Sequence, residues 1–544
     1  MSDIKITKPF FRWLFGGVGF HNSEATMTPI MSEKFKNEII YKTFREISPT
    51  YSRVFAGYAD WTREAMDAFA DYYDKTFRDA GTLLYLVPGR MPYITSDFDM
   101  EAYCEKVASN LEYLVKVRNC TKIRHYCVTN ELSVGNSYAW FSDRLDMFKD
   151  IHDCLYRAFR RHGLDIGLLA TDCSGIDKFP QIKWATDNMD EITDTYCAHL
   201  YVGNVTPGDL SAYKLYYDSF GTLVKQAKTK HKRFILGEFG INSSTKWTKY
   251  VPMLNDTCYA VDNPSKEGAY AMAICEMAMA AINCGSLAAV FWTMFDYPDP
   301  FIREDGDSPQ EKARYDVARF SGAGLEMRYN KNGLVRWCDD EKDYSSRASL
   351  YTMGYLAKLF RKGSRVLEVE IPKDTTLRCS AITNSDGSCS VAIINWENEA
   401  KALTVSIEHN LSKPMRVYRF DSENIPYSPF NDLQPHSGTV SASDGTISID
   451  IGARSMIFLT TDYVDRLPSE ITGLQISKGR LIWNPCKDSE HCYYRVFAAK
   501  EKDFTPSADN QIASTAAEGL EIYDEALYYK VVSVDRYGNT VYSR

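Results

Sequence analysis

Apolar residues follow two alternating patterns along roughly the first 300 positions of the chain. Short apolar runs, typical of strands that are buried on both faces, alternate with longer segments in which apolar residues recur every three or four positions. In residues 63–80, for example, Met66, Phe69, Tyr73 and Phe77 share one helical face, and Gly81 marks the end of the helix. Eight strands are predicted over residues 15–21, 51–55, 82–87, 123–129, 165–170, 191–199, 234–237 and 287–294.

This alternation predicts a parallel sheet, and eight strand–helix units fit a closed (β/α)8 barrel, the TIM barrel. The last barrel helix is predicted over 346–360, so residues 1–362 are assigned to the barrel. An open, doubly wound sheet is the alternative. A GxGxxG motif at the start of the first helix would favour it, but Gly16-Gly-Val-Gly19 lacks that spacing.

From about Gly363 the chain changes to short strands in which apolar and polar residues alternate, separated by turns such as Asn384-Ser-Asp-Gly387. This pattern predicts an antiparallel β-sandwich over residues 363–464. After Leu467-Pro468 a further β domain, residues 465–544, resembles a fibronectin type III module in its length and its closing strand. Such a domain binds sugar, packs on the barrel or pairs with another subunit in a homo-oligomer, and the sequence leaves all three open.

Two of the predicted barrel strands end in a carboxylate. The apolar run 234–237 leads directly to Glu238, and the strand over 123–129 leads to Asn130-Glu131. Burying an unpaired carboxylate is costly, so packing alone does not explain a glutamate at these positions. Because the C-terminal ends of parallel barrel strands meet at one rim, we expect the two glutamates to face each other there. Glycoside cleavage needs such a pair, an acid at the leaving oxygen and a carboxylate at the anomeric carbon.

With these residues in place, the segment 10–300 resembles clan A of the glycoside hydrolases, retaining enzymes built on this barrel. Asn130-Glu131 is similar to the clan's Asn-Glu after strand four. The resemblance implies that Glu131 is the acid/base and that Asn130 binds the sugar 2-hydroxyl. Glu238, in Gly-Glu-Phe-Gly, is similar to the clan's nucleophile on strand seven.

Four further residues carry the resemblance. His199-Leu-Tyr201 after strand six is similar to the clan's His-x-Tyr, which implies a hydrogen bond from Tyr201 to the nucleophile. Arg53 on strand two is similar to the arginine that keeps the nucleophile ionised, and Trp292 on strand eight to the aromatic floor of the sugar subsite. Each also has a structural alternative: rim hydrogen bonding for His199 and Tyr201, a salt bridge for Arg53, barrel core for Trp292.

The implied mechanism makes demands on charge and distance. A retaining enzyme needs its carboxyl groups roughly 5–5.5 Å apart. Arg53 is expected to lower the pKa of Glu238, while Glu131 keeps its proton in a drier, less cationic setting.

Four more residues are candidate sugar contacts from their positions. His21 and Asn22 lie just past strand one, where they would bind sugar hydroxyls. Trp61 and Trp140 follow strands two and four, where they would stack on sugar faces. A purely structural role is the alternative for each of the four.

The order of barrel and sandwich is similar to that of the family 39 β-xylosidases, although many of those have Pro where this chain has Leu132. The expected activity is double-displacement hydrolysis of a β-linked glycoside. Met1–Lys8 has no apolar h-region or cleavage site, which favours a cytoplasmic protein and hence exo action on short oligosaccharides. The alternatives are a non-catalytic carbohydrate-binding protein and a transglycosylase that uses the same carboxylates.

Charge and cysteine usage argue against other classes of partner. A net charge of −9 disfavours nucleic acid and anionic membrane surfaces. No run reaches the ~20 apolar residues of a membrane span. The fourteen cysteines contain no CxxC pair and no Cys/His set at zinc-ligand spacing, so we expect neither a metal nor a cofactor. The expected partner is a small oligosaccharide or glycoside.

Overall fold

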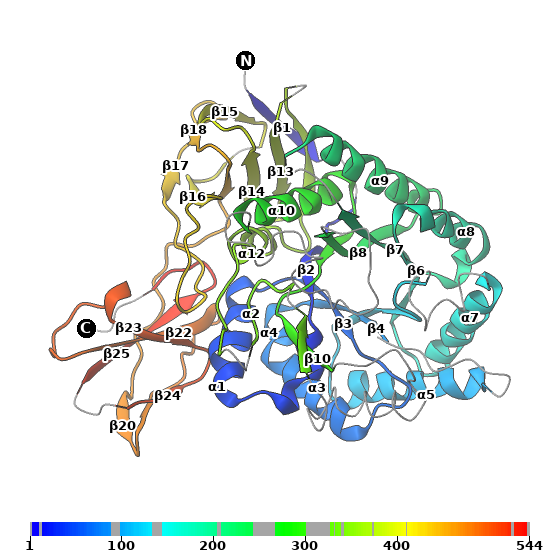
Figure 1. Ribbon diagram of the computed structural model, residues 1–544, viewed down its shortest axis with the longest axis horizontal. Helices are drawn as coiled ribbons and strands as arrows, with labels where there is room; N and C mark the ends of the chain where they lie inside the picture. Colours follow the sequence, from blue (N-terminus) through cyan, green and yellow to red (C-terminus); the bar gives the residue numbers. More distant parts are fainter. Residues whose placement is uncertain are drawn as a thin grey trace.

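A closed barrel of parallel strands forms the first domain (Figure 1). The computed structural model describes residues 3–9, 13–88, 98–132, 144–203, 208–242, 267–300, 327–330, 332–338, 342–372, 375–409, 411–523 and 527–540. The barrel strands are β2 (Gly17–His21), β3 (Tyr51–Phe55), β4 (Leu83–Val87), β5 (Ile123–Cys127), β6 (Gly167–Ser174), β7 (Thr195–Gly203), β8 (Arg233–Asn242) and β9 (Ala288–Phe291). Because β9 pairs with both β8 and β2, the cylinder is closed. The predicted barrel is confirmed, and the open-sheet alternative is wrong.

Helices cover the outside of the barrel. The longer ones are α3 (Arg63–Lys75), α5 (Met100–Glu112), α7 (Leu145–Arg161), α8 (Pro180–Asn188), α9 (Leu210–Lys228), α10 (Glu267–Cys284) and α12 (Leu350–Leu359). In α3 the side chain of Thr62 caps the N-terminus, and Met66, Phe69 and Tyr73 form the buried face, as the sequence pattern predicts. Among the described helices, none has the length and apolar character needed to cross a membrane.

Helix α10 is buried around almost its whole circumference. One side packs on the barrel and the other on the second domain, where Arg378 donates from Nε to Oε1 of Glu276 at 2.5 Å. This double burial explains why α10 is rich in Ala and Met and has no polar face.

The second domain is a sandwich made from a nine-stranded sheet in the order β17-β16-β19-β14-β13-β12-β1-β15-β18. Its strands are β1 (Ile4–Pro9), β12 (Arg365–Glu370), β13 (Leu377–Thr383), β14 (Cys389–Asn395), β15 (Lys401–Ile407), β16 (Met415–Asp421), β17 (Gly438–Val440), β18 (Thr446–Ile451) and β19 (Ser455–Thr460). Val417 and Ile449, from opposite ends of this order, share one apolar core, so the strands fold over each other.

Strand β1 lies in the sandwich and not in the barrel. It pairs antiparallel with β12 and parallel with β15, where Ile4 faces Val405. The assignment of residues 4–9 to the barrel is therefore corrected: Ile4 and Ile6 are apolar residues on one face of a short strand, and they are buried in the sandwich core.

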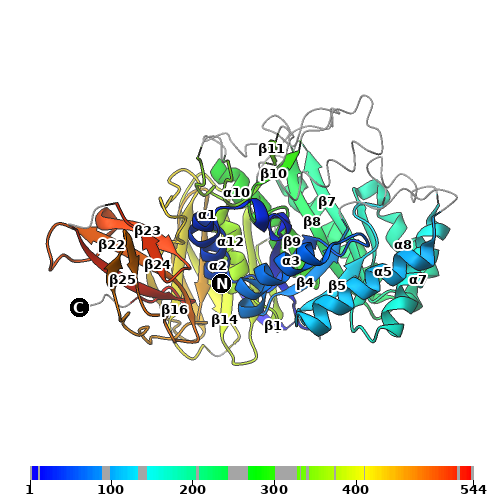
Figure 2. The same ribbon diagram turned by 90° about the horizontal axis from the view of Figure 1, so that it is seen from below.

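The C-terminal domain consists of two three-stranded antiparallel sheets. The strands are β20 (Gln475–Ser477), β21 (Arg480–Ile482), β22 (His491–Ala499), β23 (Gln511–Thr515), β24 (Gly519–Glu521) and β25 (Tyr528–Asp535). This domain lies at one end of the molecule against α2 (Lys42–Ile47) (Figures 1 and 2). Tyr493 donates to Glu46 of α2 at 2.9 Å, and Arg495 pairs with Asp432 of the sandwich at 2.9 Å. Of the three roles considered, packing on the barrel is therefore observed.

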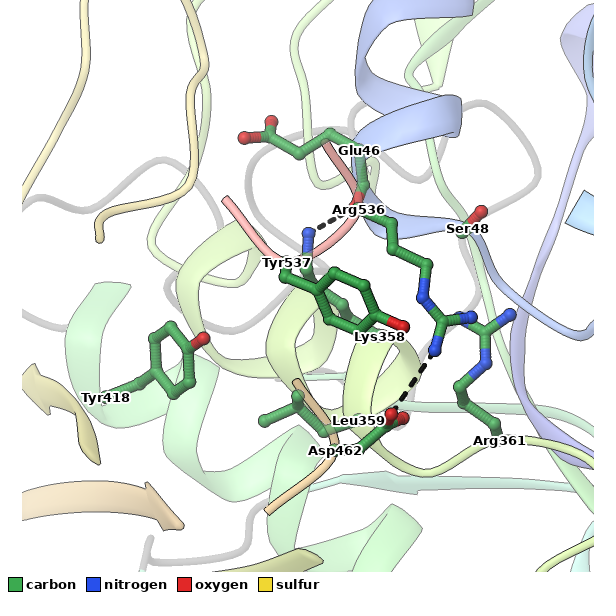
Figure 3. Close-up of a pocket in the computed structure, with 9 residues that line it drawn as sticks. All are labelled: Glu46, Ser48, Lys358, Leu359, Arg361, Tyr418, Asp462, Arg536 and Tyr537. Atoms are coloured by element: carbon green, nitrogen blue, oxygen red, sulfur yellow. Dashed lines mark hydrogen bonds and ion pairs between the residues drawn. The ribbon is translucent and has the colours of Figure 1, made fainter. Parts of the chain in front are cut away.

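A small pocket marks the junction of the three domains (Figure 3). Its charged lining consists of Glu46, Lys358, Arg361, Asp462 and Arg536. Lys358 donates to the backbone oxygen of Glu46 at 2.8 Å, and Arg536 donates to Asp462 at 3.2 Å. Because Glu46 precedes β3, the pocket lies near the end of the barrel where strands begin, away from the rim that carries the two glutamates.

Candidate active site

Glu131 and Glu238 meet at the C-terminal rim of the barrel. Glu238 lies on β8, and Glu131 follows β5 in a left-handed backbone conformation, with φ of 50°. A carboxylate oxygen of Glu131 and one of Glu238 lie within 4.8 Å of each other. This upper limit on the distance between two carboxylate oxygens is shorter than the roughly 6.5–9.5 Å of an inverting pair and is compatible with the closer spacing of a retaining pair. The facing arrangement predicted for the two acids is present.

Arg53, on β3, occupies the centre of the site and is completely buried. Its Nη1 donates to Oε1 of Glu238. Its Nη2 donates to Oδ1 of Asn130 at 2.5 Å and to Oδ2 of Asp172 at 3.0 Å. One guanidinium thus links the ends of β3, β5, β6 and β8, as suits a planar group with several fixed donors.

His199 and Tyr201, both on β7, contact the same carboxylates. The hydroxyl of Tyr201 donates to Oε2 of Glu238 at 2.8 Å. Nδ1 of His199 lies 3.3 Å from Oε1 of Glu131 and 3.5 Å from Oε2 of Glu238. The two oxygens of Glu238 therefore have different partners, Arg53 on Oε1 and Tyr201 on Oε2.

Asp172 is a central residue of the site that the sequence analysis did not select. It lies near the end of β6, is fully buried, and has φ of 58°. The pairing of β6 with β7 skips Asp172, since Thr171 faces Cys197 and Cys173 faces Ala198. Asp172 is thus a bulge residue, and a bulge turns a side chain away from the regular alternation. A carboxylate at the end of an apolar barrel strand, the signal that identified Glu131 and Glu238, was also present here.

A second bulge lies on β8 at Gly237. In the pairing of β7 with β8, Ala198 faces Leu236 and His199 faces Glu238, so Gly237 is the extra residue. A Cβ at Gly237 would lie 2.4 Å from Sγ of Cys197 and 3.2 Å from Nε2 of His199. Glycine is required here because the side chains of β7 approach the β8 backbone too closely for any other residue.

The charges of the buried groups depend on one another. Burial opposes the charge of Asp172, but His199 and Arg53 outweigh it and hold the pKa of this carboxyl well below its usual range. Burial likewise opposes the charge of His199, but Asp172 and Glu238 raise its pKa to about 10. Arg53 stays protonated because Glu238 and Asp172 raise its pKa further despite burial.

Two electrostatic expectations need correction. Burial raises the pKa of Glu238, and the lowering effects of His199 and Arg53 do not fully offset it. Arg53 therefore lowers the pKa of Glu238, as predicted, but burial has the larger effect and the net shift is upward. Glu131 is also not the drier acid: its side chain is 20% exposed, against 5% for Glu238.

His21 and Trp292 form a layer beside the carboxylates. Nδ1 of His21 lies 3.2 Å from Nη1 of Arg53, so it accepts that proton, and Nε2 then donates to Ser23 at 2.8 Å. The Trp292 ring stacks on His21 with centroids 4.3 Å apart. Both side chains are buried, with Trp292 4% exposed, and the described residues offer no acceptor for its indole N–H.

Two candidate sugar contacts, Asn22 and Trp61, are held by structural contacts of their own. Asn22 is fully buried, and its amide donates to Glu24 at 2.6 Å and to Sδ of Met294 at 3.4 Å. Trp61 packs on Tyr58 and Phe69, with 8% of its surface exposed. Both therefore take the structural alternative. Trp140 lies outside the described residues.

Two clusters contain groups of the metal-binding type: Asp172 with Cys197 and His199, and His199 with Glu131 and Glu238. In each cluster the carboxylates already face cations, because Arg53 contacts both Asp172 and Glu238. The donor atoms are thus engaged in ion pairs and hydrogen bonds.

Comparison with solved structures places this fold among glycoside hydrolases. The bacterial orthologue of human α-L-iduronidase is 13% identical over 100% of both chains, with a TM-score of 0.56. The family 51 arabinofuranosidase from Xanthomonas axonopodis pv. citri is 11% identical over 85% of this chain and 100% of its own, with a TM-score of 0.55. The family 30 subfamily 8 xylanase from Clostridium acetobutylicum is 14% identical over 85% and 99%, with a TM-score of 0.52.

A scan against protein-family models and a search of curated proteins found no match to the sequence. At these identities the structural likeness shows the fold, a barrel with additional β domains.

Proposed function

We propose that the protein is a retaining glycoside hydrolase that acts by double displacement. The observation that carries the proposal is the geometry of the acid pair. Two carboxylates lie within 4.8 Å, and each oxygen of Glu238 faces a different donor, Arg53 or Tyr201. The similarity in fold to a xylanase, an arabinofuranosidase and an iduronidase supports the same class of reaction.

In the first step Glu131 donates its proton to the glycosidic oxygen while Glu238 attacks the anomeric carbon. The C–O bond to the leaving group breaks, and a glycosyl ester forms on Glu238. Arg53 and Tyr201 orient the carboxylate for this attack. Asn130, which accepts a hydrogen bond from Arg53, is the residue we propose to bind the sugar 2-hydroxyl.

In the second step Glu131 removes a proton from water, which attacks the anomeric carbon and releases Glu238. Esterification has removed the negative charge of Glu238 from the site. Since like charges destabilise each other's ionised form, Glu131 then ionises more readily and acts as the base.

The substrate we propose is a β-linked glycoside, cleaved by exo action on short oligosaccharides, and family 39 is the proposed family within the clan. A transglycosylase would use the same residues and differ in the acceptor. A non-catalytic sugar-binding protein is the less favoured alternative. Sugar binding requires neither two glutamates that face each other nor a buried arginine, Arg53, that pairs with both Glu238 and Asp172.

Chromogenic β-xyloside, β-glucoside, β-galactoside, β-mannoside, arabinoside and α-L-iduronide substrates test the proposal. Glu238→Ala should abolish turnover, and azide should restore it with a product of inverted anomeric configuration. Glu131→Ala should still form the glycosyl ester from substrates with good leaving groups, since these need little acid assistance. Near-normal activity of Glu238→Ala would refute the assignment. Transfer to added sugar acceptors in place of water would indicate the transglycosylase.

A further inference from the structure

The carboxylate of Asp172 is saturated with donors. Its Oδ1 accepts from the Tyr85 hydroxyl at 2.5 Å and from Sγ of Cys197 at 3.1 Å, and lies 2.9 Å from Nε2 of His199. Its Oδ2 accepts from Nη2 of Arg53 at 3.0 Å. A buried ion pair contributes little net stability compared with a well-packed apolar side chain. The saturation of this carboxylate therefore points to a role other than holding the barrel together.

The position of the His199 ring defines its protonation. Its Nε2 faces Asp172, and its Nδ1 faces Glu131 and Glu238. A neutral imidazole has one donor and one acceptor nitrogen, so either tautomer would direct a lone pair at a carboxylate oxygen. Only the imidazolium donates in both directions.

We propose that Asp172 is a positioning residue that keeps His199 in the doubly protonated form and fixes the orientation of Arg53. His199 and Arg53 then bring two positive charges to the rim, and Asp172 and Glu238 balance them. The site thus holds three carboxyl groups and two cations, so one carboxyl, Glu131, can carry the proton needed in the first step without leaving a cation unbalanced. This catalytic consequence rests on the proposed function, whereas the charge of His199 does not.

Other titratable groups near His199 come from several strands, and none of them replaces Asp172. The groups that face the ring or its carboxylate partners are Glu131, Glu238, Arg53, Tyr85, Cys197 and Tyr201. Among these, Glu131 and Glu238 are the other carboxyl groups, and both lie on the Nδ1 side. Removal of the Asp172 charge therefore leaves no carboxylate on the Nε2 side of the ring among the described residues.

Nitrogen NMR of the full chain with ¹⁵N-labelled histidine tests this inference directly. The His199 signals are those that disappear in His199→Gln. In the wild-type protein both ring nitrogens should carry protons at pH 7 and remain protonated beyond pH 8. In Asp172→Asn the ring should lose its charge by about pH 6.5, the ordinary midpoint of a histidine.

The matched control is Tyr85→Phe, which removes one hydrogen bond from the same carboxylate and keeps its charge, so His199 should stay protonated at pH 8. An ordinary wild-type midpoint near pH 6.5 would overturn the inference, and the wild-type measurement does not depend on whether Asp172→Asn folds. An unchanged midpoint in a folded Asp172→Asn would overturn it as well.

The catalytic consequence is tested by measuring kcat and KM separately in the two variants. Asp172→Asn should lower kcat by about 100-fold and leave KM within a few-fold, because Asp172 acts through the orientation of groups that touch the substrate. Tyr85→Phe should lose less than about 10-fold in kcat, since it removes a single neutral hydrogen bond. If His199 is charged but the protein cleaves no glycoside, the proposed function is refuted and the charge assigned to His199 still holds.

Discussion

Glu24 is a buried carboxyl whose protonation should make the stability of the protein depend on pH. It lies in the 3-10 turn η1 (Ser23–Thr26), fully buried, and its Oε1 accepts from Asn22 at 2.6 Å and from Tyr72 at 2.7 Å. Oε2 has no partner among the described residues. Burial outweighs these hydrogen bonds and raises the pKa of Glu24 from 4.5 to about 7.

The magnitude follows from this shift. A difference from 4.5 to about 7, at about 1.36 kcal/mol per pH unit, corresponds to about 3 kcal/mol. Because the pKa is higher in the folded state, the neutral carboxyl is tolerated below pH 4.5, and stability falls as the pH rises from 4.5 to 7. Above pH 7 the loss is complete and constant.

The perturbation is Glu24→Gln, which keeps a carbonyl oxygen for Asn22 and Tyr72 and removes the titration. The loss in free energy of unfolding between pH 5 and pH 8 should be smaller in this variant than in the wild type by about 3 kcal/mol. Urea unfolding at several pH values measures it, with the infrared band of the protonated carboxyl as an independent probe of Glu24. The control is Glu64→Gln on the exposed face of α3, which should leave the pH profile unchanged.

Parallel pH profiles for the wild type and Glu24→Gln would refute the reasoning. They would mean that Glu24 is already ionised at low pH or that water solvates it in the folded protein. A band of protonated carboxyl that persists to pH 6 in the wild type and is missing from the variant would support it.

Three further perturbations test other parts of the structure. Arg378→Met leaves the buried Glu276 without its partner and should lower the free energy of unfolding by about 3–5 kcal/mol. The double variant Arg378→Met with Glu276→Met removes both charges and should recover most of the lost stability. Equal losses of stability in the single and double variants would contradict this reasoning. Tyr201→Phe removes a hydrogen bond to ionised Glu238 and should reduce kcat/KM by about 10- to 150-fold, so a change within two-fold would argue against its role. Lys42→Met leaves Glu46 and Asp432 without the cation that they share. It should speed proteolysis between the sandwich and the C-terminal domain. Gel analysis of the digestion, with Lys34→Met as the control, would show this.

The strand–helix alternation could be predicted from the sequence because each barrel unit carries a local signal. A buried strand is a short apolar run, and a covering helix has one apolar face. The two glutamates could be predicted for a related reason, since a charged residue at the end of an apolar strand contradicts its surroundings. These signals need only a few neighbouring residues.

What the sequence did not predict depends on contacts between distant segments. Asp172 was missed because the predicted strand ends at Ala170, two residues before it. The bulge that turns Asp172 inward exists only in the pairing of β6 with β7. Asn22 follows His21, but the turn at η1 directs its amide to Glu24 and away from the carboxylates. The family resemblance pointed to the two glutamates that we propose as reacting groups, and the network of contacts around them required the fold.

The placement of β1 has a consequence for the order of folding during synthesis. Ile4 leaves the ribosome well before its partner Val405, which follows about 400 residues later. At about 5–20 residues per second, β1 waits roughly 20 to 80 s for that strand. The barrel, whose strands all lie between the two, has time to form before the sandwich closes.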